Sequence, residues 1–82
     1  MNKLLVLRKL SDQNNITLQK AKINIIIVIL PISTNKFSVE LIGKDFFGVE
    51  KYSIIDTYTF QEAYQSIIAI TQALLFGQSV NL

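Results

Sequence analysis

Residues 23–32 read INIIIVILPI, and this run decides how the rest of the chain is interpreted. Only Asn24 carries a side chain that can form a hydrogen bond, and isoleucine and valine dominate the run. Because β-branched side chains are stiff and pack well on a pleated surface, the run predicts a strand. Pro31 has no amide donor and marks the end of this predicted strand.

The predicted strand is apolar on both of its faces. Successive side chains of a strand point to opposite sides. One face therefore holds Ile26, Val28 and Leu30, and the other holds Ile23, Ile25, Ile27 and Ile29. A strand of this kind needs cover on both faces, which predicts a central position in a sheet.

Shorter patterns on either side predict three more strands. The segment 3–10 (KLLVLRKL) is short and mostly apolar; it could be helical in isolation, but the β-rich sequence around it favours a strand. Residues 11–15 form a polar turn before a strand that starts near Ile16 and runs into the apolar stretch. Downstream, apolar and polar residues alternate in FSVELI (37–42). The glycine-flanked GKDFFG (43–48) fits a hairpin connection to VEKYSIID (49–56).

A helix signal follows at Thr59. Thr59 and Glu62 have the spacing of a capping box, in which each side chain binds the backbone amide of the other residue. An apolar stripe then continues at helical spacing to Leu75, and Gly77 is placed as a stop, so we expect a helix over residues 60–76. The sequence therefore predicts an α+β fold in a single domain, 1–82: a four-stranded antiparallel meander with one C-terminal helix packed on one face.

Composition argues against catalysis. The 82 residues include no cysteine and no histidine, which excludes a cysteine nucleophile, a thiolate metal site and a Ser-His relay. No phosphate-binding glycine motif is present, and the turn around Asp45 lacks the spacing of a calcium loop. Glu40 and Glu50 are candidates for paired carboxylates across a hairpin, but surface placement is favoured. We therefore predict no enzyme activity, no catalytic residue, no cofactor and no metal.

The apolar run is too short to be a membrane span. It has ten residues, whereas a spanning helix needs about 20. The N-terminal apolar segment, residues 4–7, has four residues and is shorter than the core of a secretory signal. We therefore expect a cytoplasmic protein without a membrane or targeting segment.

Charge is distributed unevenly along the chain. Residues 1–22 hold five basic residues against Asp12, a local charge of +4, whereas residues 23–82 hold three lysines against five carboxylates, a local charge of −2. Such asymmetry can favour an acidic partner, but the lysines form no strong patch. Nucleic-acid binding is therefore kept as the alternative function.

The order of these features resembles a small bacterial domain family of unknown function. The similarity runs from LRKL (7–10), through a strand ending near Pro31 and an aromatic-led strand closing in LIGK (41–44), to FQEAYQSIIAITQALL (60–75). The resemblance implies a sheet-plus-helix fold and a role beside bacterial toxins as an immunity-like protein, and it supplies no catalytic residues. The segment YTFQEAYQSI (58–67) is also similar to an antitoxin fold whose helix begins Asp-Thr-x-x-Glu-Ala.

The predicted function is that of a non-enzymatic protein-binding module. One helix can shield only one face of the sheet. The second face must be covered by a second copy of the chain, by the chain's own ends, or by a protein partner such as a toxin or effector. An immunity protein, an antitoxin and a phage-encoded inhibitor all act by occupying a partner's surface. The candidate partner-binding residues are Ile26, Val28 and Leu30 on the strand, and Phe46 and Phe47 at the hairpin tip.

Overall fold

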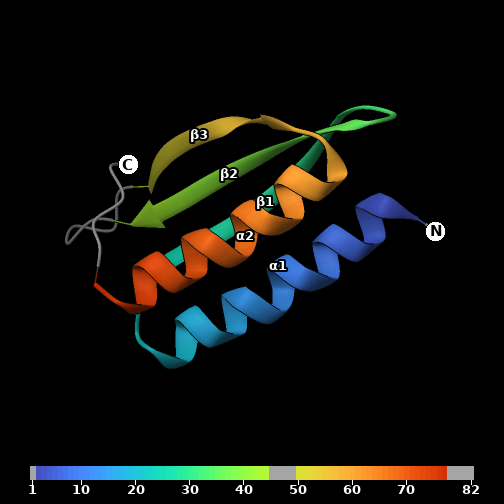
Figure 1. The fold of residues 1–82 in the computed structure, drawn as a ribbon. Coiled ribbons are helices and arrows are strands. Elements are labelled where there is room, and N and C mark those ends of the chain that lie inside the picture. Colours follow the sequence, from blue (N-terminus) through green and yellow to red (C-terminus); the bar gives the residue numbers. More distant parts are fainter. Residues whose placement is uncertain (1, 45–49, 78–82) are drawn as a thin grey trace.

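The computed structural model describes the backbone of residues 2–44 and 50–77, and the side chains of residues 2–43 and 58–77. Its elements follow the order helix, three strands, helix (Figure 1). Their bounds are α1 Lys3–Lys20, β1 Ile25–Ser33, β2 Lys36–Lys44, β3 Glu50–Tyr58 and α2 Phe60–Leu75.

The three strands form one antiparallel sheet in the order β1-β2-β3. Val28 lies opposite Glu40 across β1 and β2, and Glu40 lies opposite Ile54 across β2 and β3. The register shifts between Val39 and Glu40, so the β2–β3 ladder contains a bulge. The apolar run is thus an edge strand, and its predicted central position is wrong, because β2 occupies the centre.

The predicted four-stranded sheet with a single helix is also wrong. The α+β class holds, but the described residues form three strands and two helices. The error lies in residues 3–20, which we expected to hold a strand, a turn and the start of the next strand, and which form α1. Leucine, lysine and arginine favour helices intrinsically, and the Asn2 side chain caps the helix by accepting from the Leu5 amide at 3.1 Å.

Polar residues in the middle of α1 do not break the helix, because backbone carbonyls within it accept their hydrogen bonds. The Ser11 hydroxyl donates to the backbone carbonyl of Arg8 at 3.1 Å, and the Asn14 side-chain carboxamide donates to the backbone carbonyl of Leu10 at 2.8 Å. Such bonds to a carbonyl three or four residues earlier satisfy the side chain without diverting the backbone. The predicted turn at residues 11–15 is therefore a continuous stretch of helix.

The end of α1 is closed by a Schellman motif that lacks the usual glycine. The Lys22 amide donates to the carbonyl of Gln19 at 3.0 Å, and the Ile23 amide donates to that of Leu18 at 2.9 Å. Lys22 adopts a φ of 61°, in the left-handed region that favours glycine. Ile23 packs against the core cluster to which Leu18 belongs, and an apolar contact of this kind often accompanies the motif.

Helix α2 begins as the sequence predicts. The Thr59 side chain accepts from the Glu62 amide, and the Glu62 carboxylate accepts from the Thr59 amide at 3.1 Å, so the capping box is confirmed. The helix ends at Leu75, and Gly77 follows with a φ of 78°. The Gly77 amide donates to the carbonyl of Leu74 at 3.1 Å, as expected for a glycine stop.

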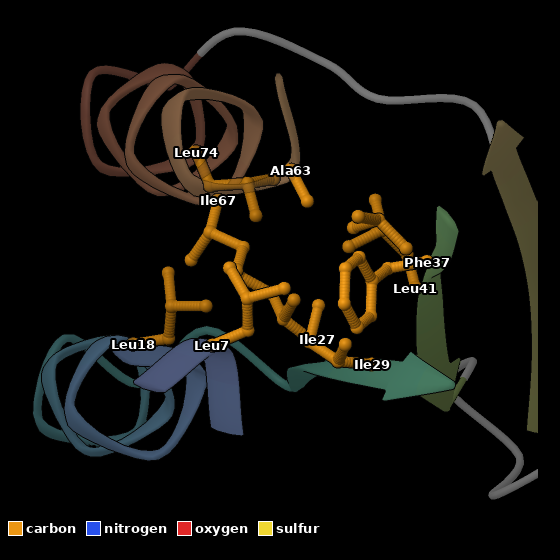
Figure 2. Packing of buried hydrophobic residues seen from close by; sticks show 10 residues of the cluster. Leu7, Leu18, Ile27, Ile29, Phe37, Leu41, Ala63, Ile67 and Leu74 are labelled. Atoms are coloured by element: carbon orange, nitrogen blue, oxygen red, sulfur yellow. The ribbon is translucent and has the colours of Figure 1, made fainter. Parts of the chain in front are cut away.

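Both helices cover the same face of the sheet. In Figure 1 they lie side by side in front of the strands, and Figure 2 shows their apolar side chains meeting those of β1 and β2. The buried cluster consists of Leu7, Leu18, Ile27, Ile29, Phe37, Val39, Leu41, Ala63, Ile67 and Leu74. The face of β1 that contains Ile27 is therefore the core face, and the face that contains Ile26 points away from the helices.

Candidate protein-binding surface

The face of the sheet opposite the helices is called here the open face, and its described side chains are mainly aliphatic. Its described members follow from strand alternation and from the β1–β2 register, in which Ile26 lies opposite Ile42 and Leu30 opposite Ser38. They are Ile26, Val28 and Leu30 on β1, and Lys36, Ser38, Glu40 and Ile42 on β2.

Burial differs sharply between the two faces of β1. Ile27 and Ile29 are 1% and 3% exposed on the core face, whereas Ile26 is 52% exposed on the open face. Leu30 is also exposed and Val28 is half-buried. The structure therefore brings the three predicted strand residues together on one accessible surface, and Ile32 adds a further exposed side chain at the end of β1.

The N-terminal segment does not cover this surface, although cover by the chain's own ends was one expectation. Residues 3–20 instead form α1, which packs on the core face beside α2. The predicted hairpin residues Phe46 and Phe47 lie outside the described part of the chain.

Glu40 is the acidic residue among the described side chains of the open face, whose other charged member is Lys36 at the start of β2. Glu40 lies on the central strand opposite Val28 and is half-buried. The sequence offered Glu40 only as half of a carboxylate pair with Glu50, and that pairing is wrong in register. Glu40 lies opposite Ile54, whereas Glu50 lies opposite Lys44.

The outer edge of β1 is capped by a side chain from α1. The Asn15 carboxamide donates to the Ile27 carbonyl at 2.9 Å and accepts from the Ile27 amide at 2.8 Å. It thus forms the two hydrogen bonds that a neighbouring strand would form at this position. Sequence reasoning missed this contact because Asn15 was assigned to a turn.

Neither metal chemistry nor a membrane span is indicated by the described residues. Among the described side chains, those of residues 2–43 and 58–77, the structure contains no group of three or more acidic side chains that could hold a metal ion. Within the same ranges, neither helix combines the length and apolar character that crossing a membrane requires.

Comparisons with known proteins add no relative to this picture. Family models, curated proteins and solved structures were compared with the chain, and none of them matches it.

Proposed function

We propose that this chain is a non-enzymatic protein-binding module whose open face docks on a partner protein. The observation that supports this proposal is the contrast between Ile26 and Ile27, adjacent residues of one strand that are 52% and 1% exposed. Contiguous apolar surface of this kind is uncommon on a protein that acts alone and is typical of an interaction site. An inhibitor of the immunity, antitoxin or phage-encoded type is the specific role we propose.

Glu40 favours a partner of different sequence over a second copy of the chain. If two open faces stacked about a two-fold axis through their centre, each would bring its own Glu40 toward the same desolvated interface. Like charges at an interface oppose association. A partner that presents a lysine or arginine opposite Glu40 would instead gain a charge-assisted hydrogen bond there.

A matched pair of substitutions tests the proposal on a complex with the product of the neighbouring open reading frame. Leu30 and Leu75 are the same residue type with similar exposure, 39% and 42%, but only Leu30 lies on the open face. We expect Leu30→Lys to weaken the complex at least tenfold, roughly the cost of one interface anchor. Leu75→Lys should leave the affinity unchanged, as measured by titration calorimetry.

Two results would overturn the proposal. One is the absence of any complex with that gene product. The other is equal affinity for the Leu30→Lys and Leu75→Lys variants with both proteins folded by circular dichroism, which would move the interface away from the open face.

Nucleic-acid binding is the second candidate, and the basic surface of α1 favours it. Lys3, Arg8, Lys9 and Lys20 are all exposed on this helix, and Asp12 is its single acidic residue. Affinity for a single-stranded oligonucleotide that falls steeply as salt rises would support this function. A protein complex that is largely insensitive to salt would support the first candidate.

A further inference from the structure

A groove separates the second half of α1 from the start of β1, and it lies apart from the centre of the open face. Its volume is about 520 Å³, within the range of ligand-binding pockets. It is lined by Asp12, Asn15, Ile16 and Gln19 from α1, and by Ile23, Asn24, Ile25 and Ile26 from the chain entering β1.

The backbone of Ile25 faces this groove with unused hydrogen-bonding capacity. Ile27 directs both its amide and its carbonyl to Asn15, so both groups point away from β2. Directions alternate along an antiparallel strand, and the β1–β2 register is regular at these positions, so Ile25 also points outward. Among the described residues, no group forms a hydrogen bond with the outward-facing amide or carbonyl of Ile25.

Asn15 limits how far a partner could extend along this edge. Its carboxamide already occupies the place of a neighbouring strand at Ile27, so an added strand must end before that residue. On the other side, the Ile23 amide is engaged by the carbonyl of Leu18. The available edge is therefore short and centred on Ile25.

We propose that this groove binds a short extended peptide segment of a partner protein, which adds to the sheet beside Ile25. Strand addition between a sheet edge and a helix uses backbone hydrogen bonds for affinity and alternate side chains for specificity. The peptide residue opposite Ile25 projects to the same side of the sheet as Ile25, toward α1, and its neighbours project beside Ile26.

The groove lining specifies which side chain suits the position opposite Ile25. Ile16 is 52% exposed, and Asp12 is exposed with no ion pair among the described residues. A lysine can lay its aliphatic stem on Ile16 and direct its ammonium group to Asp12. The favoured occupant is thus a lysine flanked by β-branched residues.

A defined peptide tests this proposal on the full chain. The probe is acetyl-Thr-Val-Lys-Val-Thr-amide, titrated to millimolar concentration while backbone amide shifts are followed by NMR. We expect the shifts to cluster on the residues that line the groove. A matched peptide carries an N-methyl group on the backbone nitrogen of its lysine and cannot donate a hydrogen bond to the Ile25 carbonyl. It should bind about tenfold more weakly.

Asp12→Asn supplies the test of charge, because Asp12 is exposed and the change keeps the side-chain shape. This variant should bind the lysine peptide several-fold more weakly but should bind a peptide with norleucine in place of lysine as the parent chain does. The proposal is overturned if no shift occurs, if the shifts lie elsewhere, or if N-methylation leaves the affinity unchanged. Ile26 belongs to both the groove and the open face, but Leu30 does not line the groove, so the Leu30→Lys variant tests the open face separately.

Discussion

Asn15 connects the helical layer to the sheet through a single carboxamide. Its two hydrogen bonds to Ile27 span twelve positions of sequence and join α1 to the strand that α1 precedes. A side chain that satisfies both an amide and a carbonyl of an edge strand prevents another chain from pairing with the strand at that residue.

Replacing Asn15 with alanine should lower the free energy of unfolding by about 1–3 kcal/mol, because the Ile27 amide and carbonyl lose their partners. Urea denaturation measures this change. Gln13→Ala, at an exposed position of the same helix, is the control and should stay within about 0.5 kcal/mol of the parent. Equal midpoints for the two variants would show that the carboxamide contributes nothing.

Lys22 is the second residue whose role is conformational. Its φ of 61° places a lysine where glycine is preferred, so Lys22→Gly should stabilise the protein by about 0.5–1 kcal/mol. The same change at Lys20, inside the last turn of α1, should destabilise it by about 1 kcal/mol. Thermal unfolding of both variants checks whether stability rises for Lys22→Gly and falls for Lys20→Gly. A loss of stability in Lys22→Gly would contradict the left-handed conformation assigned to this residue.

At the scale of elements, α2 and β2 were predicted well because their local signals agree with one another. The capping box at Thr59 and the alternation in residues 37–42 depend only on near neighbours, and α2 and β2 were predicted within about two residues of their observed ends. The segment forming α1 was misread because residues 3–10, which suit a helix in isolation, were assigned to a strand on account of the β-rich sequence around them, and because residues 11–15 resemble a turn. The Asn15 carboxamide forms its hydrogen bond with Ile27, twelve residues later in the chain, and a local sequence pattern cannot predict a contact over that separation.

The same limit explains the error about β1. Apolar residues on both faces suggested a central strand, but one face meets the helices and the other is the candidate binding surface. The strand therefore needs apolar residues on one face for the core and carries apolar residues on the other for the proposed binding of a partner. Which of the two faces the helices would take could not be derived, because both consist of aliphatic residues.

Adjacent residues of β1 test the assignment of the two faces. Ile27→Asp should unfold the protein, because an unpaired carboxylate would be buried in the core. Ile26→Asp introduces the same charge one position away, on the open face, and should leave the circular-dichroism spectrum folded. A folded Ile27→Asp variant with an unchanged melting temperature would refute the assignment of this face to the core.

At the scale of the whole molecule, the helices and the sheet make a one-sided arrangement. Two helices share one face of a three-stranded sheet, and the described side chains of the other face are mainly aliphatic, with Glu40 among them and Lys36 at the start of β2. The exposed isoleucines favour association of the free chain, whereas Glu40 opposes close stacking of two copies.

These opposing effects predict a weak self-association that one substitution can strengthen and another can weaken. In sedimentation velocity experiments, Glu40→Gln should strengthen association because it removes the like-charge repulsion. Ile26→Lys should weaken it because it adds a charge to the apolar surface. Leu5→Lys is the control, since Leu5 is 53% exposed on α1, much like Ile26 on the sheet, and it should have no effect. A strict monomer that neither open-face change alters would contradict this view.

The hydrogen bonds of Asn15 also have a consequence during synthesis of the chain. The stretch Ile25–Leu30 is a six-residue aliphatic segment without proline or charge, the composition of segments that stack into cross-β fibrils. Because a ribosome releases a polypeptide from its N-terminus, α1 emerges before this stretch does. The side chain that caps Ile27 is thus synthesised before this stretch emerges, and we expect the order of elements along the chain to limit its misassembly.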